Sequence, residues 1–268
     1  MAASSLWPFQ CPSTHETVST IIQRRSTNST DVREIALCDL DLSFAKDILD
    51  LGCGFGFMAE TLARRVAPDA RLVGVDTWGA NEAPFLEKIA AAGRRGRFIC
   101  MQLASRLPWP NRSFDLVVCS YSLYYFVDIL SEVTRILAPH GLFVTLTHTE
   151  SSMVSLLRSA GLDHDAGSEL LTLTGRFSAE NGGSLLKRWF GEVTRIDYQN
   201  SLRFEAGHVD ELLTYFRFKQ PLLVPDSKPG DDLPEAVVGF AGTLLSRGGE
   251  VVIEKNDTAF QCRRPLCP

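Results

Sequence analysis

Short apolar runs alternate with amphipathic segments along the first 150 residues of the chain. The apolar runs have the length of strands, and their unbroken apolar character is typical of parallel strands buried on both faces. Strands that alternate with helices form right-handed β-α-β units, so the pattern predicts a doubly wound α/β sheet. The predicted strands are residues 47–51, 71–76, 97–101, 114–119 and 142–146, and the predicted helices are residues 59–66, 83–92 and 129–137.

The pattern is less regular at both ends of the chain. Residues 1–30 carry little periodicity, and a helix follows that Thr30 or Asp31 can cap. The segment 165–191 is helical with breaks at its glycines, and residues 221–234 contain four prolines and predict a loop or lid. The other predicted elements are helices at residues 149–162, 208–218 and 234–245 and strands at residues 193–204 and 250–262.

Composition narrows the class of protein. The 268 residues are 45% hydrophobic and 22% charged, with a net charge of −5, which gives no basic surface for nucleic acid. No apolar run approaches the roughly 20 residues of a membrane span, and the first residues do not resemble a secretory signal, so we expect a cytoplasmic protein. The seven cysteines include no C-x-x-C pair. We expect no metal site, although Cys262 and Cys267 could pair or bind a metal.

A glycine-rich turn follows the first predicted strand. The run Asp50-Leu51-Gly52-Cys53-Gly54-Phe55-Gly56 leads from the strand into a helix, whose N-terminus favours a polar ligand. The spacing is G-x-G-x-G, and Phe57 stands where a dinucleotide-binding turn has its third glycine. Asp50 would repel a pyrophosphate but attract the ammonium and sulfonium of S-adenosylmethionine. Asp76, which ends the second strand, can accept hydrogen bonds from ribose hydroxyls of either ligand.

The chain resembles the class I methyltransferases that use S-adenosylmethionine. The resemblance rests on four blocks in the family's order, over roughly residues 45–148. They are the glycine turn with Asp76, the run 107–110, the run 113–118 and the run 135–143. It implies a Rossmann-like sheet of seven mostly parallel strands, in which residues 193–204 and 250–262 form an antiparallel edge pair.

The resemblance also implies a division of the chain. Residues 1–44 would be an N-terminal segment or helical lid, and residues 45–268 would be the methyltransferase domain. Residues 205–248 exceed what the sheet needs and predict a helical substrate cap. Residues 1–25 are open to a second interpretation, a disordered tail with one packing helix.

Cofactor contacts are carried over from the family by position. The turn residues Gly52, Cys53, Gly54 and Gly56 would hold the methionine part and ribose, together with Asp50 and Asp76. Thr77 and Trp78 would lie near the adenine, and the backbone N–H of Ala104 would face its ring. Many relatives have an acid where this chain has Leu103, which leaves the contact to the adenine amino group open. Ser120 would border the methionine part.

Three side chains are candidates for chemistry. Tyr124 and Tyr125 stand where relatives often carry a His pair, and they could line an apolar pocket or simply pack in the core. His148 follows the fifth strand and is the candidate general base, with Glu150 to orient it. Alternatively, His148 is a loop residue without a catalytic role that precedes a helix capped by Thr149.

The sequence therefore predicts methyl transfer to a small-molecule acceptor, by a monomer or homodimer. Three alternatives stay open. The first is an oxidoreductase that uses NAD, which Asp50 and Phe57 disfavour. The second is a scaffold that binds S-adenosylmethionine without catalysis. The third is methylation of a protein or RNA, which the acidic balance disfavours.

Overall fold

The computed structural model describes residues 7–103, 106–162, 169–224, 226–247 and 249–266. The chain divides into two compact units. One comprises residues 32–147, 176–198 and 258–268, and the other comprises residues 1–31, 148–175 and 199–257. We call them the sheet unit and the helical unit.

The sheet unit is built on a sheet that, within the described residues, has seven strands in the order β3-β2-β1-β4-β5-β9-β6. The strands β1 to β5 pair in parallel. The order reverses between β1 and β4, which is where doubly wound folds bind ligands. The strands are β1 (Asp47–Leu51), β2 (Arg71–Asp76), β3 (Arg95–Cys100), β4 (Phe114–Ser120), β5 (Leu137–His148), β6 (Phe190–Tyr198) and β9 (Asp257–Pro265). The predicted Rossmann-like fold is confirmed.

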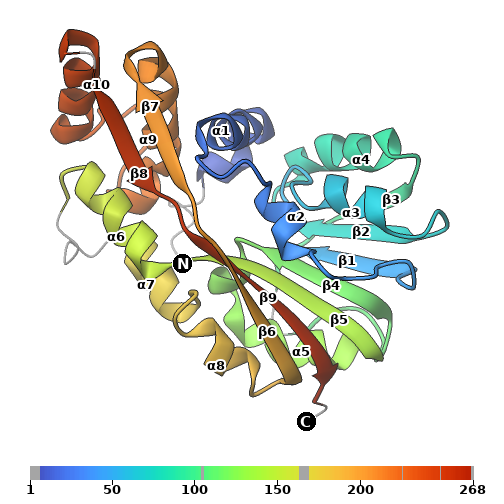
Figure 1. Ribbon diagram of the computed structural model, residues 1–268. Coiled ribbons are helices and arrows are strands. Elements are labelled where there is room, and N and C mark those ends of the chain that lie inside the picture. The colour runs from blue at the N-terminus through green and yellow to red at the C-terminus, as the bar shows by residue number, and fades with distance from the viewer. Residues whose placement is uncertain (1–6, 104–105, 163–168, 225, 248, 267–268) are drawn as a thin grey trace. The chain divides into compact units, whose positions relative to one another are not determined.

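Helices cover both faces of this sheet (Figure 1). The helices α2 (Val32–Ala36), α3 (Ala59–Arg65) and α4 (Glu82–Ala91) lie on one face, where Leu62 and Phe85 belong to one buried cluster with strand residues. The helix α5 (Leu130–Ile136) lies on the other face, and α8 (Gly182–Leu186) contacts β6. Burial of strand side chains on both faces explains their unbroken apolar runs.

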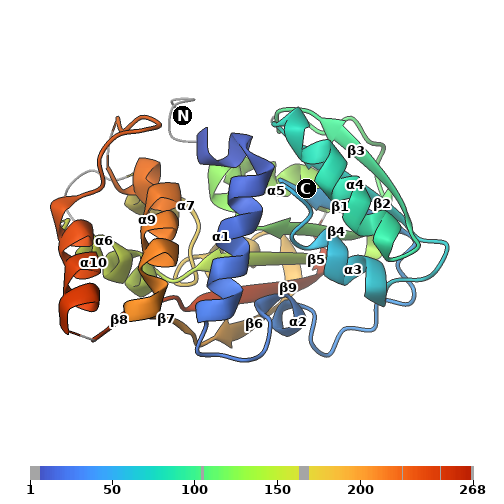
Figure 2. The ribbon, with the colours of Figure 1, turned by 90° about the horizontal axis from the view of Figure 1, so that it is seen from above.

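The helical unit contains α1 (Pro12–Arg25), α6 (Glu150–Ser159), α9 (Val209–Leu223) and α10 (Glu235–Arg247), with most of α7 (Glu169–Arg176). It also contains the antiparallel pair β7 (Ser201–Glu205) and β8 (Glu250–Glu254). Figure 2 shows α1 and α9 side by side, and Val18, Ile21, Leu212 and Phe216 are buried in this unit.

The structure corrects the predicted strands 193–204 and 250–262. Each is two strands, so that β6 and β9 are neighbours in the large sheet whereas β7 and β8 form a separate pair. The breaks fall at two asparagines. The Asn200 N–H donates to the Asn256 side-chain oxygen at 2.8 Å, and the Lys255 N–H donates to the Asn200 carbonyl at 3.0 Å. Asparagine side chains compete in this way with strand hydrogen bonds.

Three further boundaries differ from the prediction. Residues 12–25 form the helix α1 within the expected N-terminal helical segment, although their weak periodicity gave no bounds for it. The helix α9 continues to Leu223 and includes Pro221, so the predicted loop begins only after Leu223. The strand β5 begins at Leu137, because residues 137–141 join it through an irregularity in its pairing with β4.

Candidate functional site

The glycine turn lies at the carboxyl end of β1. Gly52, Gly54 and Gly56 all adopt positive φ angles, of 68°, 50° and 90°. The Gly52 N–H donates to the carbonyl of Val75 at 2.8 Å, which ties the turn to β2. A Cβ at Gly52 would lie 2.6 Å from Ser122 Oγ. The turn therefore requires glycine for its backbone angles and at Gly52 also for space.

Asp50 is the last residue but one of β1 and lies just before this turn. Only 4% of its surface is exposed, and its Oδ2 finds no hydrogen-bond partner among the described residues. Burial, followed by the nearby charge of Asp76, raises the pKa of Asp50 to about 7. A buried carboxylate with an unpaired oxygen is costly, and a cation placed beside it would remove that cost.

Asp76 ends β2 and is held by three donors. Its Oδ2 accepts from the Gly54 N–H at 2.8 Å, and its Oδ1 accepts from the Trp78 N–H at 2.9 Å and from Asn81 Nδ2 at 3.2 Å. The two predicted carboxylates, the turn and the half-buried Trp78 thus come together at one edge of the sheet. The buried Oδ1 of Asn81 lacks a partner in the part of the chain that the structure describes, and sequence reasoning missed this residue.

The segment after β4 borders the same turn. Ser122 Oγ donates to the Leu51 carbonyl at 3.0 Å, and Tyr121 adopts a φ of 53°, which is strained for a non-glycine residue. The buried Ser120 Oγ has no partner within the described ranges. The rings of Tyr124 and Tyr125 meet edge to face, 4.8 Å apart between centroids, and Tyr124 is 7% exposed.

The remaining predicted cofactor residues have less distinctive surroundings. Cys53 is buried, and burial raises the pKa of its thiol well above the usual value, so it is not a nucleophile. Thr77 is exposed, and its carbonyl accepts a hydrogen bond from Cys100 Sγ. Leu103 is half-buried, and Ala104 lies outside the described residues.

His148 belongs to the helical unit, where it is 7% exposed. Its Nδ1 lies 2.7 Å from Asp257 Oδ1, and Lys255 Nζ lies 2.6 Å from Asp257 Oδ2. The carboxylate that orients His148 is therefore Asp257, whereas the sequence suggested Glu150. Sequence reasoning missed Asp257 as the partner of His148, because the two residues lie 109 positions apart along the chain.

Protonation in this group follows from burial and charge. Burial raises the pKa of Asp257, but Lys255 and His148 outweigh it and bring the pKa to about 2. Burial and the charge of Lys255 lower the pKa of His148 to about 4. An ionised carboxylate only accepts, so the neutral imidazole carries its proton on Nδ1 and its lone pair on Nε2.

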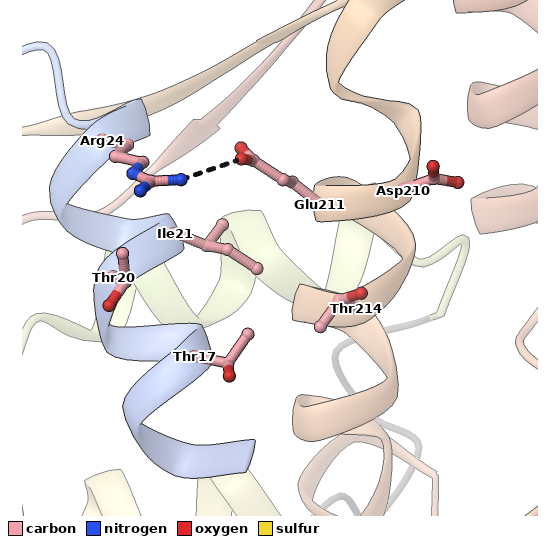
Figure 3. Close-up of a pocket in the computed structure, with 7 residues that line it drawn as sticks. All are labelled: Thr17, Thr20, Ile21, Arg24, Asp210, Glu211 and Thr214. Carbon is pink, nitrogen blue, oxygen red and sulfur yellow. Dashed lines mark ion pairs between the residues drawn. The ribbon is translucent and has the colours of Figure 1, made fainter. Parts of the chain in front are cut away.

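A concave region of the helical unit lies between α1 and α9 (Figure 3). The surface that lines this groove of about 300 Å³ is more apolar than polar, and several of its polar groups have partners nearby. Arg24 and Glu211 form an ion pair at 4.0 Å, and the hydroxyls of Thr17 and Thr20 donate to carbonyls of their own helix. We assign it no ligand.

The described residues contain neither a candidate metal site nor a candidate membrane-spanning helix. They contain no group of three His, Cys, Asp or Glu residues that could hold a metal ion. They also contain no helix long and apolar enough to span a membrane. Cys262 is buried, and Cys267, its predicted partner, lies outside the described residues.

Comparisons with known proteins agree with the geometry of the glycine turn. A family model for the methyltransferase domain matches residues 48–141. A demethylmenaquinone methyltransferase of Symbiobacterium thermophilum is 35% identical over 104 residues, which are 37% of this chain and 41% of that protein. A demethylmenaquinone methyltransferase of Geobacillus kaustophilus is 27% identical over 188 residues, which are 69% of this chain and 74% of that protein.

Among solved structures, the cyclase SpnF has the same fold, with a TM-score of 0.51 over 96% of both chains at 16% identity. The chain thus spans less than half of the first of these relatives, and the SpnF match concerns the fold alone. The segment that matches the family model contains the glycine turn, Asp50 and Asp76. Residues 48–141 of this chain are therefore similar to a methyltransferase domain.

Proposed function

We propose that the chain transfers a methyl group from S-adenosylmethionine to a small-molecule acceptor. The observation that carries this proposal is Asp50, a buried carboxylate at the glycine turn whose Oδ2 lacks a partner among the described residues. The ammonium of the methionine part would supply the missing partner and lower the pKa of Asp50 from about 7. A pyrophosphate at this position would instead add repulsion to an unfavourable burial.

Other residues of the turn fit the same ligand. Asp76 is fixed by three donors, and its carboxylate oxygens keep further lone pairs for the ribose hydroxyls. The bare backbone at Gly52 and Gly54 permits close approach of the ligand. The half-buried Trp78 is suited to lie beside the adenine. We assign Leu103, Ala104, Thr77 and Ser120 to the same site from their positions after the strands.

The chemistry asks little of the protein. When bound, S-adenosylmethionine supplies an electrophilic methyl group, and holding the acceptor in line with it can contribute about 7–11 kcal/mol. We propose that Tyr124 and Tyr125 line the acceptor side of the site. In the helical unit, the pair of His148 and Asp257 is the candidate to move a proton, because its geometry fixes the imidazole tautomer.

The acceptor is proposed as a small molecule because the two curated relatives are named for demethylmenaquinone. The matched family model covers the glycine turn but not the helical unit, so the acceptor of this chain need not be a quinol. We propose that α9 and α10, which carry much of residues 205–248, form a cap for that acceptor. The free thiols of Cys38, Cys100 and Cys262 are compatible with a cytoplasmic location.

Titration with S-adenosylhomocysteine tests the cofactor assignment. Asp76→Ala should weaken binding at least about tenfold, since it removes a ligand of the ribose and a partner of the turn. Asp69→Ala is the matched control, because Asp69 is an exposed acid whose ion pair among the described residues is with Lys46. Equal affinity of the Asp76→Ala variant and the wild type would contradict the assignment. Binding without transfer of a labelled methyl group to any acceptor would favour the scaffold alternative.

A further inference from the structure

Asn81 stands at the N-cap of α4, where an asparagine side chain usually binds the free N–H groups of the first turn. Here the side chain forms no capping bond with the described residues, and Pro84, the third residue of α4, has no N–H to offer. The side chain is turned to Asp76 instead, and only 1% of the surface of Asn81 is exposed. The asparagine therefore serves Asp76 and not the helix.

The contact with Asp76 fixes which way the Asn81 amide faces. Its Nδ2 lies 3.2 Å from Asp76 Oδ1, and a carboxylate accepts hydrogen bonds but does not donate them. Turning the amide over would place two oxygens against each other. The Oδ1 of Asn81 is buried and finds no donor among the described residues. Such an orphaned acceptor is unfavourable, and an N–H or O–H of a ligand would remove the cost.

Asn81 lies just beneath the surface of the sheet unit. Its neighbours Ala80 and Glu82 are exposed, and Trp78 is half-buried. The side chain of Asn81 is thus covered by a surface segment and not by the central core. A ligand that Asp76 holds can come within hydrogen-bond distance of Asn81, because the two side chains are themselves in contact.

Three oxygen acceptors follow one another along this edge of the sheet. Asp50 belongs to β1 and Asp76 to β2, while the segment of Asn81 lies against β3, since a Cβ at Gly79 would be 3.5 Å from Cys100 Sγ. The strands β3, β2 and β1 are neighbours, each about 4.8 Å from the next. A ligand that spans this edge must present donors. S-adenosylmethionine carries donors in this order, as the ammonium, the ribose hydroxyls and the adenine amino group.

We propose that Asn81 accepts a hydrogen bond from the adenine amino group and thereby selects adenine over other purines. That the ligand is an adenine nucleoside rests on the proposed function. Leu103, half-buried after β3, has no side-chain acceptor for this amino group. A purine with a carbonyl in place of the amino group would bring an oxygen against Oδ1 of Asn81. The amide cannot turn over to meet it, because its oxygen would then face Asp76.

Calorimetric titration of the full chain with two ligands tests the proposal. S-adenosylhomocysteine carries the amino group, and S-inosylhomocysteine carries a carbonyl oxygen in its place. The wild type should bind the adenosyl compound at least about tenfold more tightly, because the carbonyl of the inosyl compound would face a buried oxygen. Equal affinities of the wild type for the two compounds would overturn the proposal without any variant.

Variants show whether Asn81 causes the preference. Asn81→Leu removes the acceptor and also the donor to Asp76, so both ligands should bind more weakly and the preference should fall to within about threefold. Asn81→Asp keeps an acceptor and should keep the preference, although both affinities fall. Asn111→Leu is the matched control at an exposed asparagine of the same unit and should behave as the wild type.

The preference, and not the affinity alone, separates contact with adenine from support of Asp76. If Asn81→Leu weakens both ligands but keeps the full preference, Asn81 acts only through Asp76 and the ribose, and the proposal is wrong. The same titrations distinguish this failure from that of the proposed function. Binding of S-adenosylhomocysteine without a preference that depends on Asn81 would leave the cofactor assignment standing. Binding of neither compound by the wild type would contradict the cofactor assignment itself and the role of Asn81 with it.

Discussion

The burial of Asp50 predicts that replacing it makes the cofactor-free protein more stable. Its pKa of about 7 lies well above 3.8, and a difference of one in pKa corresponds to about 1.4 kcal/mol. Keeping the ionised carboxylate buried therefore costs the folded chain about 4 kcal/mol above pH 7. Between pH 4 and 7 the unfolded chain binds fewer protons than the folded one, so stability falls as pH rises through this range. Asp50→Asn removes the titrating group and with it this loss.

Urea unfolding of the wild type and of Asp50→Asn at several pH values measures the effect. The variant should gain little at pH 4 and up to about 4 kcal/mol at pH 8, while its affinity for S-adenosylhomocysteine falls. Glu87→Gln, at an exposed acid on α4, serves as control and should show no such gain. A stability difference that does not change with pH, or that favours the wild type at pH 8, would refute the buried acid.

Three further changes have outcomes that the structure sets. Gly52→Ala should lower the free energy of unfolding more than Gly93→Ala does. Both glycines have φ near 70°, but a Cβ would meet another side chain only at Gly52. The difference between the two variants in urea unfolding therefore measures the cost of that close contact, and equal losses would contradict it. Asp257→Asn should remove about 2 kcal/mol of stability that is present above pH 4 and is lost as pH falls towards 2, and an unchanged acid unfolding profile would contradict this. Thr149→Ala removes the side-chain cap of α6 and should cost about 1 kcal/mol by the same assay, with no cost meaning that the cap is unimportant.

The sheet was predictable because its signals are local. Each buried parallel strand has a continuous apolar run, and the glycines of the first turn and the acids near the carboxyl ends of β1 and β2 stand beside those runs. The edge at which Asp50 and Asp76 meet follows from strand direction alone. The burial that raises the pKa of Asp50 does not follow, since it depends on packing from the whole unit.

The helical unit was less predictable because its contacts join distant segments. The helix α1 has a weak apolar stripe and is held by α9, so local pattern did not reveal it. The split of two strands depends on hydrogen bonds between Asn200 and Asn256, which lie 56 residues apart. The charged residues around His148 likewise come from β5, α9 and the segment that joins β8 to β9. No spacing along the sequence indicates that these segments meet.

The most direct test of the central claim is calorimetric titration of the purified protein with S-adenosylhomocysteine and, separately, with NAD. The buried Asp50 and the glycine turn predict micromolar binding of S-adenosylhomocysteine and no binding of NAD. Because the ammonium would ionise Asp50, binding at pH 7 should also release protons to the buffer. Binding of NAD alone would contradict the account.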